Sequence, residues 1–330
     1  VYKRQVSRDR LIAECGLDPD ILDEVDSTVT HSYAVVRYGK LCHEFYHPED
    51  PGPNKLAPNW SATKTLGAVA VGRAIAMSAD LPRPLRDTDR MDAWVDDITF
   101  NPDALVAHVL AMIGFNESLN YGQREFSYDA AGQREINRLV DVIEAVLAQD
   151  PAHFGGAGTL GEFTQREIFD RLGMKTSAWG GISIAGSWNS NLRDMARLGL
   201  LLIHYGVWDQ QRILEPEWVY KMTHPSFEDA TVGFGYLTWL ATGPFRTCEP
   251  YPVWPQYPHP PSESPDCGYD GEFSCMQMHD SGVFAAAGAG GQLIVGHRGL
   301  DLVIVTRDAG QLAFISDPWA LVRRALIAHD

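Results

Sequence analysis

The chain has 330 residues, of which 45% are hydrophobic and 21% are charged. A chain of this length and composition buries a sizeable core, which excludes an intrinsically disordered protein. The 43 acidic and 27 basic residues give a formal net charge of −16, which argues against nucleic acid or an anionic membrane surface as a partner. No apolar run approaches the roughly 20 residues that span a bilayer.

The N-terminus and the cysteines bear on the compartment. Val1–Arg10 lacks the apolar stretch of a signal peptide, although the chain starts without Met. The five cysteines are odd in number, and Cys248, Cys267 and Cys275 share one Pro-rich stretch, where a disulfide would restrain a long loop. The cysteines favour an oxidising compartment. The protein is expected to be periplasmic or extracellular if an export signal precedes Val1, and cytoplasmic otherwise.

The first two thirds of the chain predict a hairpin followed by helices. Two apolar, β-rich runs in residues 32–46 flank Tyr38-Gly39-Lys40, which predicts a hairpin with Gly39 in the turn. A Pro-rich loop follows at 48–58, and helical periodicity begins near Ser61. Further helices are expected at 102–113, 131–147, 160–172, 191–204 and 215–222, with Gly173 and Gly206 as C-caps.

The last third returns to strand patterns. Strands are expected at 234–240, 291–295 and 300–306, and a closing helix at 318–328. An aromatic and Pro-rich insertion at about 244–278 interrupts them.

The order along the chain is therefore strands, a helical middle, strands and a closing helix, which is the pattern of an α/β (α+β) chain.

Ser61-Ala-Thr-Lys64 carries the most specific chemistry. If a helix starts at Ser61, Lys64 lies one turn later on the same face, where its amine can take the proton of the Ser61 hydroxyl. A serine needs such a base because its hydroxyl is a weak nucleophile at neutral pH. The tetrapeptide alone also occurs by chance, with the serine as an ordinary N-cap.

An ordered series of further motifs supports the catalytic interpretation. These are residues 35–41, 60–65, 126–132, 171–174, 187–201, 212–219, 233–236, 287–292 and 300–305. In this order the chain resembles the β-lactamase-like serine hydrolases: class C β-lactamases, DD-peptidases, family VIII esterases and nylon-oligomer hydrolases. The resemblance extends from about residue 30 to the end, apart from the insertion. It implies the β-lactamase/transpeptidase-like α/β (α+β) fold, as a single domain of two lobes. The α/β lobe would comprise about 25–60 and 233–330, with an antiparallel sheet built from both chain ends, and the helical lobe about 61–232. The reaction that it implies needs no cofactor and no metal.

The resemblance also implies further site residues. Tyr128 would shuttle a proton between Ser61 and the leaving group, with Lys64 lowering its pKa to favour the phenolate; Tyr121 is a competing candidate. The third motif reads Ala286-Ala287-Gly288, and the backbone amides of Ser61 and Ala289 would form the oxyanion hole. Gly288, Trp188 and Tyr236 are expected to contact the substrate.

Two departures from the pattern of these hydrolases narrow the range of expected activities. Ala130 replaces the usual Asn of the second motif, and the third motif has no Lys or His to dock a substrate carboxylate. Both departures weaken the β-lactamase and DD-peptidase interpretations and leave those of an esterase or amidase. A catalytically inactive scaffold or binding protein of the same fold stays open.

Other motifs are weaker. Cys42 and His43 with His47 are candidate metal ligands, but neighbours along a strand point to opposite faces, so no metal site is expected. Asn59-Trp-Ser61 is formally a glycosylation sequon, but a glycan there would cover the proposed nucleophile, so the match is interpreted as chance. The sequence therefore predicts a serine hydrolase of a small ester or amide. It leaves the natural substrate and the oligomeric state undetermined.

Overall fold

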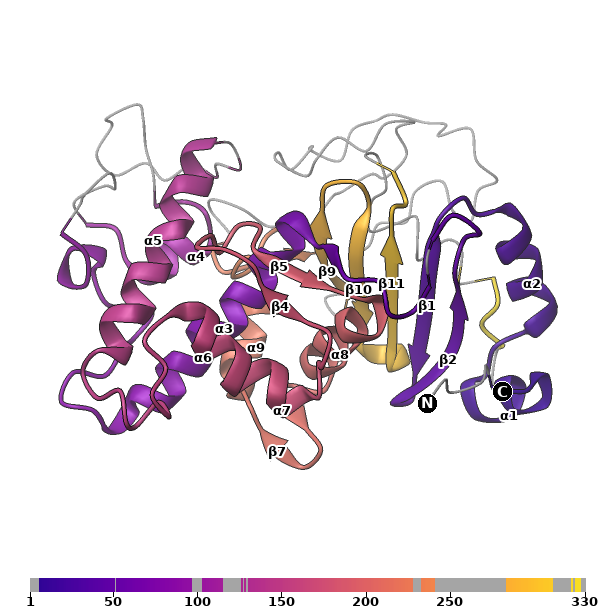
Figure 1. Cartoon of the computed structure of the whole chain (residues 1–330), viewed down its shortest axis with the longest axis horizontal. Coiled ribbons are helices and arrows are strands. Elements are labelled where there is room, and N and C mark those ends of the chain that lie inside the picture. The colour runs from indigo at the N-terminus through magenta and orange to yellow at the C-terminus, as the bar shows by residue number, and fades with distance from the viewer. Residues whose placement is uncertain are drawn as a thin grey trace.

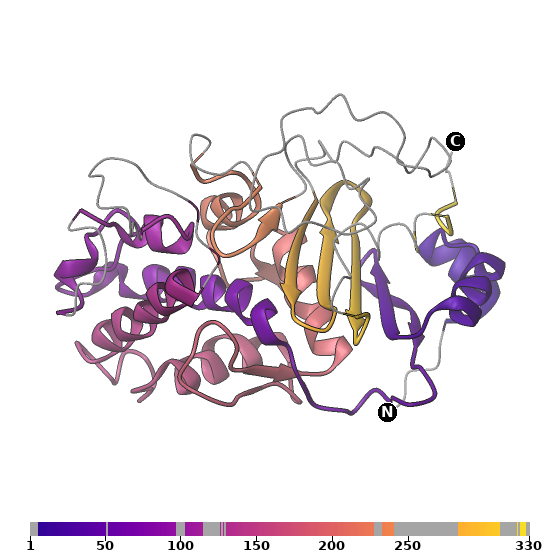
Figure 2. The ribbon, with the colours of Figure 1, turned by 90° about the horizontal axis from the view of Figure 1, so that it is seen from above.

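The computed structural model describes residues 6–50, 52–96, 103–114, 126, 128, 130–227, 233–240, 283–310, 322 and 324–327, with the backbone alone for 130–134. A six-stranded sheet lies in the middle of the molecule (Figures 1 and 2). One group of helices lies at one end, and two N-terminal helices lie at the other.

The sheet combines strands from both ends of the chain. The predicted hairpin forms as β1 (Ser32–Arg37) and β2 (Lys40–Phe45). The later strands are β8 (Trp239–Leu240), β9 (Val283–Gly288), β10 (Gln292–His297) and β11 (Leu302–Arg307). The order is β2-β1-β11-β10-β9-β8, and each neighbouring pair is antiparallel. This confirms the expected antiparallel sheet from both chain ends.

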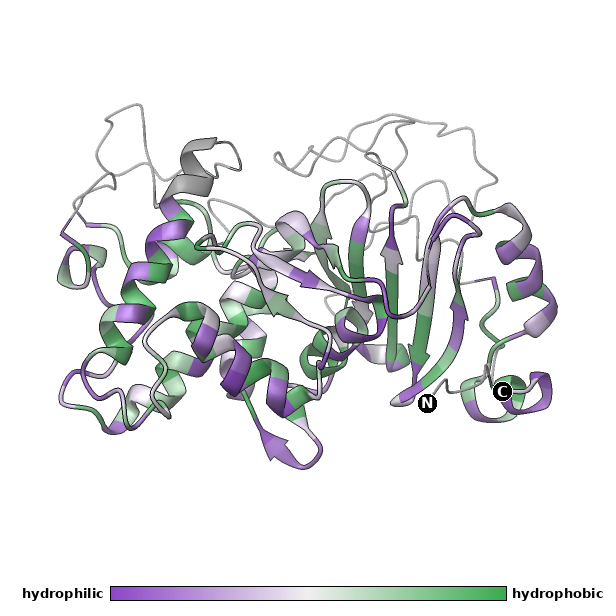
Figure 3. Ribbon diagram, in the orientation of Figure 1, coloured by the Kyte–Doolittle hydropathy of each residue, from purple (hydrophilic) through white to green (hydrophobic). Residues whose placement is uncertain are grey.

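Both faces of the sheet are covered, as the alternation of its side chains requires. Tyr33 and Val35 belong to one hydrophobic cluster, whereas Ala34 and Val36 belong to the other. All six residues of β1 are buried, and Figure 3 shows the central strands as largely apolar. A strand buried on both faces reads as a continuous apolar run, which is the pattern that the sequence showed.

Two N-terminal helices that the sequence analysis did not identify pack on the face of the sheet that carries Tyr33 and Val35. They are α1 (Arg8–Cys15) and α2 (Pro19–Thr28). The Asp18 side chain caps α2, and Pro19 occupies its first turn, so the sequence did contain the pattern that marks the start of this helix. A disulfide between Cys15 and Cys42 joins α1 to β2.

The helix α8 (Leu192–Ile203) covers the opposite face, where a helix was predicted. Gly199 permits close packing: a Cβ at that position would lie 2.5 Å from a methyl carbon of Val303 on β11. The Arg193 guanidinium also forms an ion pair with Glu44 of β2, at 2.7 Å. The helix is thus fixed against the sheet by packing and by charge.

The remaining helices form the group at the other end of the molecule. They are α3 (Thr63–Met77), α4 (Val106–Leu110), α5 (Ala130–Leu147), α6 (Leu160–Thr164), α7 (Asp170–Leu172) and α9 (Pro216–Thr223). A π-helical turn, Gln165–Phe169, links α6 to α7, and Gly173 ends α7 in the left-handed conformation. The helix α3 is buried on most sides, which explains its uniformly apolar sequence.

Short elements complete the described chain. Three small strands pair in the order β3 (Ala57–Pro58), β5 (Trp188–Ser190) and β4 (Ala178–Trp179). A two-stranded ribbon consists of β6 (Val207–Trp208) and β7 (Gln211–Arg212). The 3₁₀ turns are Trp60–Ala62, Ser78–Asp80, Met91–Ala93 and Arg298–Leu300.

Three predicted elements differ from the structure. The strand at 234–240 is limited to β8, because the preceding residues turn, with Leu237 at a positive φ of 48°. The helix at 102–113 shortens to α4. The closing helix predicted at 318–328 does not include residues 324–327, which form a turn in which Leu326 bridges to Leu17. The predicted insertion lies outside the described residues.

Candidate active site

Ser61 and Lys64 meet at the start of α3. Ser61 lies in the 3₁₀ turn Trp60–Ala62, and Lys64 follows in the first turn of α3. The Lys64 amine lies 2.7 Å from the Ser61 hydroxyl oxygen and 3.4 Å from the carbonyl oxygen of Ala185. The helix therefore begins two residues later than the sequence suggested, and the tighter turn still puts both groups on one side.

The Lys64 side chain is buried, with 1% of its surface exposed. Because burial disfavours the charged form, it lowers the pKa of the Lys64 ammonium to about 7. A substantial fraction of the amine is then neutral at physiological pH. A neutral amine in contact with a hydroxyl is able to accept its proton.

Tyr128 lies beside the same pair. Its ring centre is 4.8 Å from the Lys64 amine nitrogen. Burial raises the pKa of Tyr128 to about 12, and hydrogen bonds with Ser61 and Trp239 act in the opposite direction. The expectation of a phenolate is therefore wrong: the buried phenol keeps its proton at neutral pH, and a neutral Lys64 offers it little stabilising charge. The competing Tyr121 lies outside the described residues.

An aromatic cluster surrounds the phenol. Tyr128 packs against Trp239 with ring centres 4.9 Å apart and against Phe234 at 6.3 Å, and Phe126 completes the group. Sequence analysis could not assemble this cluster, because its members come from segments more than 100 residues apart. The cluster excludes water from the phenol, which is the physical cause of its raised pKa.

The end of β9 packs on the turn that carries Ser61. A Cβ on Gly288 would lie 2.1 Å from the carbonyl oxygen of Asn59 and 3.2 Å from the amide nitrogen of Ala62. Only a glycine allows two backbone segments to approach this closely. The strand predicted at the third motif is thus present, and its last residue contacts the backbone on both sides of Ser61.

Asn59 is a residue of this site whose role the sequence analysis missed. Its side chain is buried and its amide donates to the Ser190 hydroxyl at 2.7 Å, while its carbonyl accepts from the Ala62 amide at 3.0 Å. These bonds hold the turn around Ser61 in place. A buried, bonded amide has no room for a glycan, which agrees with the interpretation of the sequon as chance.

Two residues expected to contact substrate are packing residues in the structure. Trp188 is fully buried and its indole N–H donates to the Ser177 hydroxyl at 3.1 Å. Tyr236 is 4% exposed and its hydroxyl donates to Asp87 at 2.9 Å. Because both side chains are enclosed and their polar atoms are hydrogen-bonded to other protein groups, the prediction that they contact the substrate is wrong.

The described residues show no other catalytic cluster. Cys42 is committed to its disulfide, the His43 ring bonds Asp26 at 2.9 Å, and no group of three or more potential metal ligands gathers in the described part. No helix among the described residues is long and apolar enough to cross a bilayer. Cys248, Cys267 and Cys275 lie outside the described ranges.

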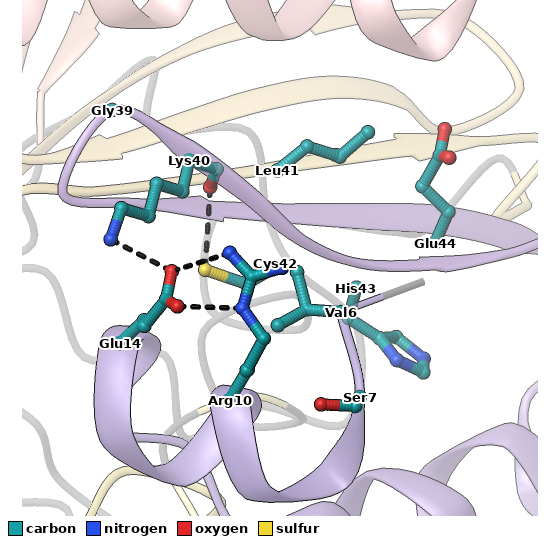
Figure 4. Close-up of a pocket in the computed structure, with 10 residues that line it drawn as sticks. All are labelled: Val6, Ser7, Arg10, Glu14, Gly39, Lys40, Leu41, Cys42, His43 and Glu44. Carbon is teal, nitrogen blue, oxygen red and sulfur yellow. Dashed lines mark hydrogen bonds and ion pairs between the residues drawn. The ribbon is translucent and has the colours of Figure 1, made fainter. Parts of the chain in front are cut away.

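A surface cavity of about 590 Å³ opens elsewhere, between α1 and β2 (Figure 4). Three of its charged side chains pair with one another, since Arg10 and Lys40 both bond Glu14, at 2.6 and 2.9 Å. It adjoins the edge strand β2, whereas β9 lies near the opposite edge. This cavity is therefore separate from the Ser61 site.

Comparisons with known proteins identify the fold. No family model matches the sequence, and a search of curated proteins finds no match. A family VIII carboxylesterase structure matches with a TM-score of 0.62 and 11% identity, covering 98% of this chain and 97% of that one. A β-lactamase from Mycobacterium bovis matches with 0.59 and 16%, covering 93% and 98%. A penicillin-binding protein homologue from Caulobacter crescentus matches with 0.59 and 13%, covering 98% and 96%.

These neighbours establish the expected fold. The chain has the β-lactamase/transpeptidase-like α/β fold, which it shares along nearly its whole length with a carboxylesterase, a β-lactamase and a penicillin-binding protein homologue. At 11–16% identity the likeness concerns the fold alone, so activity has to be argued from the side chains.

Proposed function

We propose that the protein is a serine hydrolase that cleaves a small ester or amide through an acyl-enzyme on Ser61. The observation that carries this proposal is the 2.7 Å contact between the Ser61 hydroxyl and a buried Lys64 amine whose pKa lies at about 7. Burial of an amine costs stability, and such a cost is expected where the neutral amine is used as a base.

We assign the acylation step to three side chains. The Ser61 oxygen attacks the substrate carbonyl carbon while its proton passes to the Lys64 nitrogen. The protonated Tyr128 phenol donates its proton to the leaving oxygen or nitrogen as the carbonyl bond to it breaks. Lys64 then returns a proton to the Tyr128 oxygen, so the amine and the phenol regain their starting forms.

The developing negative charge on the carbonyl oxygen requires fixed donors. We assign this role to the backbone amides of Ser61 and Ala289, the residue that follows Gly288 at the end of β9. The close packing of Gly288 on the Ser61 turn supports this pairing. In deacylation a water attacks the acyl-enzyme, its proton passes to the amine–phenol pair, and the Ser61 hydroxyl is restored.

The strand beside the nucleophile favours a neutral substrate over a β-lactam or peptide C-terminus. Its third motif, Ala286-Ala287-Gly288, supplies no cation to bind a substrate carboxylate. Hydrolysis of a short-chain ester or an amide is therefore expected to exceed that of a chromogenic cephalosporin. The reverse order would favour the β-lactamase alternative.

A fluorophosphonate probe tests the proposal directly. Peptide mass spectrometry is expected to find the label on Ser61 and to find none in Ser61→Ala. Ser27→Ala, which removes an exposed hydroxyl of α2, is the matched control and should label like the parent protein. If a folded parent protein stays unlabelled, the hydrolase proposal is overturned and the inactive-scaffold interpretation takes its place.

A further inference from the structure

Two large apolar side chains are exposed on segments that contact the proposed site. Trp60 directly precedes Ser61, is 51% exposed and has a positive φ of 48°. A bulky residue rarely adopts this left-handed conformation, and such strain is concentrated at functional sites. Ile182 is 89% exposed, the highest value among the large exposed apolar residues of the described chain.

Ile182 lies on the loop 180–187, which connects β4 to β5. Three residues later, the carbonyl oxygen of Ala185 lies 3.4 Å from the Lys64 amine. Since a chain extends by at most about 3.6 Å per residue, Ile182 is within about 11 Å of Ala185. The loop that presents Ile182 is thus in direct contact with the catalytic amine.

Hydrogen bonds hold this loop in one conformation. The Gly180 amide donates to the Ser187 carbonyl at 2.7 Å, and the Ser183 amide donates to the Ser187 hydroxyl at 2.9 Å. From α5, the Asn137 side-chain oxygen accepts bonds from the Ser183 hydroxyl and the Ile184 amide, at 2.9 and 3.0 Å. Ile182 is therefore held in solvent by a fixed loop in which Ile184, two residues later, is fully buried.

The charge around the amine points to the same class of ligand. Burial lowers the pKa of Lys64, and the hydrogen-bond contacts of its amine among the described residues are two uncharged groups, the Ser61 hydroxyl and the Ala185 carbonyl. A charged substrate group would lose hydration there without gaining a partner, apart from Lys64 itself. An apolar group has no favourable hydration to lose there, and it gains contact area with the exposed tryptophan and isoleucine side chains.

We propose that Trp60 and Ile182 form an apolar clamp for the acyl chain of the substrate, which makes the natural substrate a neutral ester or amide with an apolar acyl group of medium length. This inference rests on the proposed hydrolase function. It assigns to Trp60 and Ile182 a role in selecting substrates and none in the chemistry.

Labelling rates of Ser61 test the clamp without knowledge of the natural substrate. Phosphonofluoridates with a methyl and a hexyl group are compared in the parent protein, in Trp60→Asn and in Ile182→Ser. Asparagine tolerates the left-handed backbone at position 60, and serine at the exposed position 182 leaves the core untouched. Tyr220→Ser is the matched control, since Tyr220 is 55% exposed on α9.

The hexyl probe is expected to label the parent protein faster than the methyl probe. Each clamp variant should lower this hexyl-to-methyl ratio about tenfold, because burial of a few methylene groups contributes that much. Tyr220→Ser should keep the parent ratio. If Ser61 is labelled and both clamp variants also keep the parent ratio, the clamp is overturned and the hydrolase proposal stands; if Ser61 is not labelled at all, both are overturned.

Discussion

Lys64 determines the expected pH dependence of the reaction. Its pKa is lowered to about 7, and the neutral amine is the form that accepts the Ser61 proton. Labelling of Ser61 is therefore expected to rise with pH, about tenfold per unit below pH 7, and to level off above pH 8. Lys64→Arg, which stays protonated at these pH values, should lose activity about 10³-fold or more. A rate that is constant from pH 5 to 9 would contradict the role of Lys64.

Tyr128 is expected to matter most when the leaving group is basic. Tyr128→Phe keeps the ring against Trp239 and removes only the hydroxyl. An anilide should lose about 10²–10⁴-fold in kcat, whereas a p-nitrophenyl ester, whose leaving group needs no proton, should lose much less. Tyr236→Phe is the matched control, because its hydroxyl bonds Asp87. Equal losses of kcat for the anilide and the ester would exclude Tyr128 as the proton donor to the leaving group.

At the scale of elements, the contact of β9 with the Ser61 turn is the contact that we expect to be most sensitive to substitution. In Gly288→Ala the new Cβ would lie 2.1 Å from the Asn59 carbonyl oxygen, so strand and turn must separate. We expect a loss of about 1–3 kcal/mol in the free energy of unfolding and a larger loss of labelling at Ser61. Thermal unfolding and probe kinetics measure the two effects.

Gly158→Ala is the control for this substitution. The nearest atom to its new Cβ is a Glu162 carboxylate oxygen at 3.8 Å, an ordinary contact, and its φ is not positive. Its stability and labelling should match those of the parent protein. If Gly288→Ala behaves in the same way, the close approach of β9 has no part in the site.

The helices show which element predictions succeed from sequence alone. The extents of α5 and α8 match their predicted ranges within one residue, because each has a strong 3.6-residue periodicity and α8 has a capping Asn191. The strand predicted at 234–240 is limited to β8, because the chain turns at Leu237, whose φ is 48°, and Phe234 packs against Tyr128. Tertiary packing overrides local propensity where a segment contributes to the site.

For the whole molecule, the Cys15–Cys42 disulfide fastens the N-terminal helices to the sheet. It closes a loop with a sequence separation of 27 residues, which corresponds to a stabilisation of about 3 kcal/mol. The variant with both cysteines changed to Ala is expected to have a Tm several degrees lower. Its Ser61 labelling at 25 °C should persist, because β2 and β9 are separated by three strands. An unchanged Tm would show that the helices are held by packing alone.

The sequence by itself determined the local and ordered features of this protein: the hairpin, the amphipathic helices, the Ser61 and Lys64 spacing, and the series of motifs that indicated the fold. Each depends on residues near one another in the chain or on their order along it. Only the tertiary structure decided the protonation of Tyr128, the burial of Trp188 and Tyr236, the disulfide partner of Cys42 and the contact of the loop that carries Ile182 with Lys64. These depend on which distant segments exclude water from a group, and the free energy of a charge or a hydroxyl is governed by that surrounding medium.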